Sequence, residues 1–467
     1  MAHNVNGTDL KGGRPGRALP GMRLKAFIPV SLIAWMFPVL LSASPFSLSE
    51  ACRRAQEYDV QVKSSEADLK ISQEEVLKAA SSFKPNIRAS TSRGRNRTES
   101  ITTYVPGGDT VYYNTLSNSV SLRQPLFNME DIASWKQARA VRAKSESLLM
   151  SEKSRLIVRT AEAFFNVLYA QQNVAFTRAQ TTASVEQLKQ ARSRHHEGFG
   201  TITEISEAEA SYDTAVADEA SGVASLDFNR RELERVTGIY TEELSRFLPE
   251  RMSLDRIEPH DVNEWIQMAG KNSPKLGAAR QDIQIARREV ERSRAFRYPT
   301  VDLVAGRSCS VSENNYTIGS TYDTWSVNLQ VSVPIYTGGY TGASIRQAVA
   351  KRMKSDDQLI WQERTMASDI RKFYNGVLNG EVQIKAYEQA VKSNETAVDG
   401  TREGFKAGFR TNVDVLNAQQ KLLESRRNLA RARYQYILDR LMLKEAAGVL
   451  TVADIDEIER WFSTDRS

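Results

Sequence analysis

The sequence has few long apolar runs. Its mean hydropathy is −0.45 and 41% of its 467 residues are hydrophobic. Only one stretch, residues 26–41, is predominantly apolar, whereas a membrane protein built of several helices needs several such runs of about 20 residues. The sequence therefore excludes that class. A charged content of 26% with a net charge of only +6 also excludes a disordered tail of one charge sign.

The cysteine count and the positions of the prolines also limit the possible structures. Cys52 and Cys309 are the only cysteines, too few for a disulfide framework, and we interpret both as unpaired. None of the 13 prolines lies in residues 126–248 or 335–467. Because a proline costs a helix interior about 3 kcal/mol, these two stretches favour very long helices.

The N-terminal region resembles an export signal. Arg23 and Lys25 precede the apolar run, and small residues follow it at 42–44, so residues 1–44 are predicted to be a secretory signal peptide. An N-terminal anchor helix is the alternative, and the compact signal that begins at Met22 favours translation from there. Without residues 1–44 the chain has 58 basic and 56 acidic residues, a charge of +2. The pI of about 9.1 is then no argument for binding nucleic acid, which we do not expect.

The rest of the chain is an internal duplication. Residues 198–208 (GFGTITEISEA) match residues 408–418 (GFRTNVDVLNA), and weaker matches in the same order surround Pro125 and Pro334. Self-similarity of this kind predicts a repeated structural unit. The predicted domains are a first repeat over residues 45–240, a linker over 241–262 and a second repeat over 263–467.

Each repeat is predicted to contain the same elements in the same order. Helical stretches at 48–82 and 263–296 end before a proline, and segments of period-two alternation follow, which predict β-hairpins at 86–125 and 300–336. The polar stretches at 106–109 and 312–324 are interpreted as the hairpin loops. Long helices at 129–197 and 340–404 and shorter helices at 201–236 and 411–447 complete the repeats.

Both the predicted helices and the predicted strands have surfaces that must pack against other elements. Leu416, Leu423, Ala430 and Ile437 are spaced seven apart, which indicates a seam for helix packing, and a helix over 129–197 would be roughly 100 Å long. Four strands cannot close a barrel, and lipid does not tolerate open sheet edges. If the strands span a membrane, several chains must therefore pool them. A small soluble sheet that caps a coiled coil is the alternative.

Taken together, these motifs resemble the TolC family of outer-membrane factors. The resemblance rests on the duplicated order of elements, the two Gly-Phe-x-Thr-x-x-Glu/Asp-Ile/Val turns, PIYTGG at 334–339 and VDVLNA at 413–418. It implies a mainly α-helical homotrimer in the outer membrane of a Gram-negative cell, with a 12-stranded membrane β-barrel that continues into a helical tunnel in the periplasm. The implied function is a passive exit duct for secreted proteins or small toxic molecules.

The resemblance also implies partners, namely outer-membrane lipid, a periplasmic adaptor and an inner-membrane transporter. A secreted coiled-coil structural protein without a pore is the alternative, and an enzyme is a further one. No catalytic residues, cofactor or metal are expected. His195, His196 and Glu197 are adjacent and so point to different faces of a helix, which does not suit metal binding.

The candidate functional residues lie at the turns between the helices. The resemblance places a periplasmic gate there, with Asp414 in an acidic ring, Asn417 where a second acid would stand, and Arg410 as a latch towards Thr203 and Glu204. Phe405 replaces a tyrosine of the family. The turns themselves are marked by Gly198, Thr201, Gly408 and Thr411, and the predicted turns from strand to helix by Pro125, Pro334, Gly338 and Gly339.

Two interpretations of the turn residues remain open. An Arg410–Glu204 contact would be a charge-assisted bond, and several copies of Asp414 around one axis would attract cations. Alternatively, Thr201 and Thr411 are N-caps, and Glu204 and Asp414 complete capping boxes three residues later.

Overall fold

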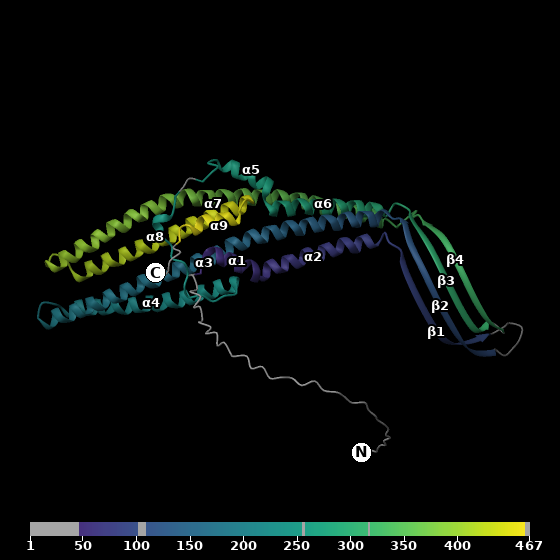
Figure 1. The fold of residues 1–467 in the computed structure, drawn as a ribbon, viewed down its shortest axis with the longest axis horizontal. Helices are drawn as coiled ribbons and strands as arrows, with labels where there is room; N and C mark the ends of the chain where they lie inside the picture. The colour runs from purple at the N-terminus through teal and green to yellow at the C-terminus, as the bar shows by residue number, and fades with distance from the viewer. Residues whose placement is uncertain (1–45, 101–108, 255–256, 316–317, 463–467) are drawn as a thin grey trace, which may run out of the picture. The chain divides into compact units, whose positions relative to one another are not determined.

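The structure, a computed structural model, describes residues 46–100, 109–254, 257–315 and 318–462. Residues 44–467 form one unit by their internal contacts. In this unit a helical segment, a strand pair, a long helix and a shorter helix follow one another, and the same order then repeats (Figure 1). The predicted fold class, mainly helical with duplicated strand pairs, is confirmed. The predicted signal peptide and most of the predicted loop at 106–109 lie outside the described residues.

The predicted helical stretches at 48–82 and 263–296 are helical, but each is divided into two helices. The first consists of α1 (Leu48–Tyr58) and α2 (Val60–Ser81), and the second of α5 (Val262–Asn272) and α6 (Pro274–Ala295). Asp59 leaves the helical conformation, with ψ 126°, and its carboxylate accepts a bond from the backbone N–H of Val62. Ser273, with ψ 118°, is excluded from the α region by the proline that follows it.

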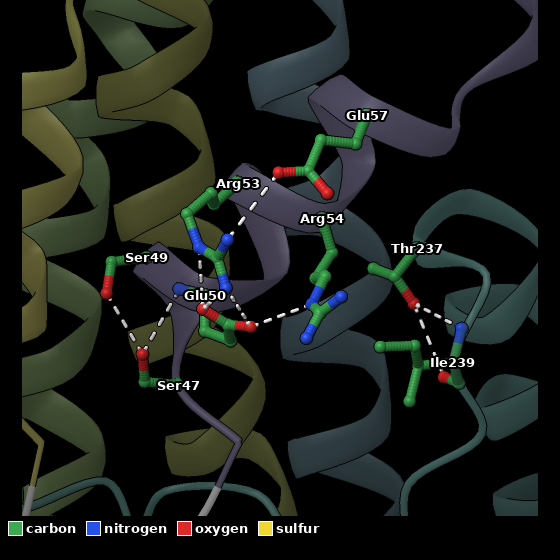
Figure 2. A network of polar contacts seen from close by, with 8 residues as sticks. All are labelled: Ser47, Ser49, Glu50, Arg53, Arg54, Glu57, Thr237 and Ile239. Atoms are coloured by element: carbon green, nitrogen blue, oxygen red, sulfur yellow. Dashed lines mark hydrogen bonds and ion pairs between the residues drawn. The ribbon is translucent and has the colours of Figure 1, made fainter. Parts of the chain in front are cut away.

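The division at Asp59 is fixed by tertiary contacts. Its second carboxylate oxygen lies 2.8 Å from the Arg159 guanidinium, and the two side chains are only 8% and 19% exposed. Near the start of α1 the contacts are more superficial: Glu50 accepts bonds from Arg53 and Arg54, as Figure 2 shows, and Arg53 contributes most to lowering the pKa of Glu50. Exposed pairs of this second kind stabilise a helix by only a few tenths of a kcal/mol each.

The strands form one antiparallel sheet in the order β1-β2-β3-β4 (Figure 1). They are β1 (Asn86–Ser100), β2 (Asp109–Phe127), β3 (Thr300–Asn315) and β4 (Ile318–Ser332). The two repeats meet where β2 pairs with β3, and β1 and β4 are the edges of the sheet.

The predicted loop at 312–324 is wrong, because β3 continues to Asn315 and β4 already pairs from Ile318. This part of the hairpin carries polar residues on both faces, as in the pair Ser312↔Ser320 on one face and Cys309↔Asp323 on the other. The alternation that reveals a half-buried strand is therefore absent, although the backbone ladder needs no apolar side chain.

The register places apolar side chains on one face of the sheet. Val301 is opposite Val331, Leu303 is opposite Leu329, and Ala305 is opposite Val327. On the first hairpin Ile87 is opposite Leu122. Because side chains alternate between faces, the intervening polar residues share the other face, where Ser90 and Ser119 form a 2.8 Å hydrogen bond.

The two junctions between sheet and long helix differ. Pro125 lies inside β2, at an irregularity in its register with β3, so it precedes the turn instead of forming it, a correction that fits a residue without an N–H to donate. Asn128 then caps the next helix through its side chain. After β4, Pro334 lies outside the strand, and Gly338 and Gly339 have φ of +60° and +85°, which only glycine adopts readily.

The long helices form two hairpins. In the first repeat α3 (Met129–His196) packs along α4 (Ile202–Thr237), and in the second α7 (Tyr340–Lys406) packs along α8 (Asn412–Ala447). The helix α3 also contacts α6 and α8. No helix among the described residues is long and apolar enough to cross a membrane.

The main core joins both repeats to the C-terminal segment. The rings of Phe165 and Tyr434 stack at 5.6 Å, and Phe164 and Phe247 both meet Phe462 edge to face. Phe462 follows the short helix α9 (Val452–Glu459), and the linker before α5 contains the turn η1 (Pro249–Arg251). These aromatic contacts hold α3 and α8 together far from the sheet, at the base of both helical hairpins.

Candidate functional site at the two helical turns

The turns of the two helical hairpins have the same backbone. Gly198 and Gly408 have φ of +81° and +80°, and each follows the last residue of its long helix by two positions. In the first turn the N–H groups of residues 199 and 200 both donate to the carbonyl of Arg194. In the second turn the N–H groups of residues 409 and 410 both donate to the carbonyl of Gly404. The left-handed glycine and these bonds satisfy the carbonyl groups that a helix end leaves free.

The shorter helices begin with threonine caps, but only one has a complete capping box. Thr201 and Thr411 accept bonds of 3.2 Å from the N–H groups of Glu204 and Asp414. Asp414 returns the contact by accepting bonds from the N–H and the hydroxyl of Thr411. Within the described residues the Glu204 side chain makes no such bond, so the capping box predicted in both repeats forms in the second alone.

The capping contacts favour the ionised form of Asp414. The N–H and hydroxyl of Thr411 lower the pKa of this carboxyl below its ordinary value, and the nearby Arg410 adds to the effect. A lowered pKa means that the carboxylate caps the helix at all pH values above its ordinary pKa. The contribution is lost as the pH falls through the lowered value.

Glycine and arginine exchange places between the two turns. The first turn has Arg194 and Gly200, and the second has Gly404 and Arg410 at the equivalent positions. A Cβ on Gly200 would lie 3.2 Å from the Cβ of Arg194, and a Cβ on Gly404 would lie 2.9 Å from the Cγ of Arg410. The two positions touch, so each turn accommodates one long side chain there, on opposite sides of the bend.

Arg194 links the two turns, and sequence reasoning missed it. Its guanidinium carbon lies 4.9 Å from the centre of the Phe405 ring, and both side chains are partly buried. The aromatic face that replaces the family's tyrosine thus receives a cation from the first repeat. The sequence signal for Arg194 was that the equivalent residue of the second repeat, Gly404, is a glycine.

A second link lies further up the hairpins. Gln187 of α3 donates a 2.8 Å hydrogen bond to Gln419 of α8, and both side chains are buried. Nearby, the hydroxyl of Ser184 and the side-chain N–H₂ of Asn412 are buried without a partner among the described residues. The contact between the hairpins is therefore partly polar and incompletely satisfied, which makes it weaker than an apolar seam.

The contacts of the predicted latch are not made within a single chain, and the latch stays a prediction. Among the described residues no hydrogen bond or ion pair joins Arg410 to Thr203 or Glu204. Arg410 and Thr203 are exposed, and Glu204 is half-buried. Asn417 is exposed on α8 three residues beyond Asp414, on the same side of the helix. Phe199 and Phe409, at the tips of the turns, are 78% and 87% exposed.

The apolar face of the sheet is a second candidate functional surface, because large apolar side chains on it are exposed. Trp325, Val327 and Leu329 on β4 are 74%, 74% and 63% exposed. On the same face, Arg307 forms a two-bond ion pair with Asp323 and lies over the Trp325 ring. Within the described residues no group of three or more His, Cys, Asp or Glu side chains could hold a metal ion.

Comparisons with known proteins agree with this architecture. The family model described as outer membrane efflux protein matches the chain twice, at residues 51–239 and 265–449, once in each repeat. The chain is 32% identical over 436 residues to the alkaline protease secretion protein AprF of Pseudomonas aeruginosa, with 91% of this chain and 90% of AprF covered. It is 28% identical over 438 residues to the outer membrane protein TolC of Vibrio cholerae, with 93% and 98% covered.

Among solved structures, the fold matches the CmeC outer membrane channel of Campylobacter jejuni. The TM-score is 0.76 at 15% identity, and 89% of this chain and 90% of CmeC are covered. The chain therefore belongs to the outer membrane efflux protein family and is a non-enzymatic efflux and secretion channel protein of the Gram-negative outer membrane.

Proposed function

We propose that three copies of this chain form one exit duct, in which their sheets join into a 12-stranded membrane barrel and their helices form the tunnel below it. The observation that carries the proposal is the open sheet. β1 and β4 each leave one row of backbone N–H and C=O groups without a strand partner in this chain. Lipid offers no hydrogen bonds to such groups, so each β1 must pair with the β4 of a neighbouring copy.

The exposed side chains support the same assembly. The apolar face of the sheet, with Val327 and Trp325, has the character of a surface that contacts lipid, and the polar face that of a channel lining. On α7, Met353 and Trp361 are 58% and 61% exposed and line one shallow depression. Large apolar side chains along a helix are typical of an interface, and neighbouring copies would cover them.

The turns are proposed to form the gate at the periplasmic end of the duct. The hairpin α7–α8 would close the tunnel while it is held against α3–α4, and the Arg194–Phe405 and Gln187–Gln419 contacts are the links that hold it. Opening then requires these contacts to break as α7–α8 moves outwards. Three copies of Asp414 near the axis would form a ring that attracts cations, and Asn417 leaves a second ring uncharged.

The cargo is proposed to be secreted protein. The relative AprF is named for the secretion of an alkaline protease, and the likeness to it covers nearly the whole of both chains. We expect the duct itself to supply no energy, since the sequence contains no nucleotide-binding P-loop motif. An inner-membrane transporter and a periplasmic adaptor would drive and align the export.

The assignment of the two sheet faces can be tested with adjacent residues on β4. Val327→Arg should prevent the appearance of heat-modifiable oligomers in the outer membrane, because a lipid-facing arginine costs about 2–4 kcal/mol in each copy near the bilayer centre. Asn328→Arg, on the polar face, should assemble normally. Electrophoresis of outer-membrane fractions with and without heating measures both. Equal assembly of the two variants would refute the face assignment.

The link between the turns can be tested in planar bilayers. Arg194→Gln removes the cation over Phe405 and should raise the conductance of the closed channel, since the closed state loses about 1 kcal/mol in each protomer. Arg192→Gln is the matched control, because Arg192 pairs with Glu209 inside the first hairpin. A closed-state conductance unchanged in Arg194→Gln, or raised equally in the control, would show that this contact does not hold the gate.

The acidic ring can be tested through ion selectivity. Asp414→Ala should lower the preference for cations, measured as the reversal potential in a salt gradient, and Asn417→Asp should raise it by adding a second ring one turn away. Thr411→Ala removes the cap hydroxyl but keeps the carboxylate, and should leave the selectivity close to that of the parent channel. If Asp414→Ala keeps its cation preference, the residue serves only as a helix cap.

A further inference from the structure

Three arginines stand in a row on the edge strand β1. Arg93, Arg95 and Arg97 occupy alternate positions and all three are exposed. The pairing of β1 with β2 runs from Asn86 to Ser100 without a register shift, so the three side chains lie on the same face as Ile87. On the proposed function, that face is the one that contacts lipid.

The position along the strand places this arginine row at the outer boundary of the bilayer. A tilted strand needs about 9–11 residues to cross the hydrocarbon layer. Counted from Asn86, where β1 leaves the helical part, the crossing ends near residues 94–96. The lower part of this face carries Ile87 and Ala89, and beyond Thr91 every residue of that face as far as position 97 is an arginine.

The charge of the arginine row is only partly compensated within the chain, by Glu99 and Glu313. Arg93 and Arg95 form no ion pair with any described residue, and Arg97 reaches Glu99 only at 3.8 Å, where both side chains are more than half exposed. Arg97 also lies over the Tyr112 ring, at 6.0 Å from its centre. Glu313, on β3, accepts two bonds from the neutral Asn114 and interacts electrostatically with Arg93, so it offsets part of the charge of the arginine row.

A neighbouring copy would not supply the missing acid either. In the proposed trimer the edge strand β4 of the next copy lies beside β1. Asp323 is the only acidic residue of β4, and the guanidinium of Arg307 in its own chain already holds it with bonds of 3.0 and 2.7 Å. The arginine row therefore keeps a net positive charge in the assembled duct.

We propose that Arg93, Arg95 and Arg97 bind the phosphate groups of the phosphorylated glycolipid in the outer leaflet of the outer membrane. Guanidinium groups match phosphate oxygens with two parallel hydrogen bonds, and alternate strand positions present three of them along one line. Long arginine stems can cover apolar surface while their heads reach the headgroup layer. The inference rests on the proposed function, since it needs the sheet to span that membrane.

The test compares the purified parent channel with the variant R93Q/R95Q/R97Q in mild detergent, by native mass spectrometry with added bisphosphorylated lipid A. The affinity should fall about fivefold for each arginine removed and on the order of a hundredfold for all three, from the value of one basic residue at an anionic membrane surface. R93K/R95K/R97K, which keeps the charge but loses the paired hydrogen bonds of the guanidinium groups, should bind with an affinity between those of the parent and the triple glutamine variant. Dephosphorylated lipid A should bind the parent channel as weakly as lipid A binds the triple variant.

The matched control is Arg88→Gln, which removes an arginine from the opposite face of the same strand and should bind lipid A like the parent. Outer-membrane fractionation and bilayer conductance distinguish a failure of the proposed channel function from a failure of the phosphate site. A parent chain that neither enters the outer membrane nor conducts would refute the proposed function. Normal channels whose triple variant binds lipid A as tightly as the parent, or an equal loss in Arg88→Gln, would overturn the phosphate site alone.

Discussion

Backbone hydrogen bonding at the edges of the sheet is the constraint on which the rest of the structure depends. One chain supplies four strands, and β1 and β4 cannot pair with each other inside it without closing a barrel that is too small. Only partner chains can satisfy these edges in lipid. α3 begins within two residues of the end of β2, so the short connection makes the helices follow the symmetry of the joined sheets.

The duplication gives the duct two helical hairpins of similar length and different chemistry. The core around Phe165 and Tyr434 fixes both at one end, and polar contacts link them towards their tips. At the turns the repeats diverge: the first has Arg194 and an incomplete cap, and the second has a complete capping box around Asp414. A rigid base with weaker, partly polar links near the tips suits a gate that must open without unfolding the tunnel wall.

Much of this fold could be predicted from the sequence, because proline, glycine and alternation report on local backbone requirements. The long first helix, predicted over 129–197, runs from Met129 to His196. The division at Ser273 was missed although Pro274 stood in the sequence. The strands around Ser312 were missed because polar residues on both faces interrupt the apolar alternation there. The Arg194–Phe405 contact joins residues far apart in the chain, so the exchange of arginine and glycine between the turns marked Arg194 but did not reveal its partner.

The central claim is that one chain is an incomplete channel and that three complete it. Its most direct test is the mass of the particle extracted from outer membranes in mild detergent, measured by native mass spectrometry. We expect a single species of three chains, about three times the mass of the mature polypeptide. A stable monomer or dimer that still conducts ions in planar bilayers would contradict the claim, because its sheet edges would then be satisfied without the proposed partners.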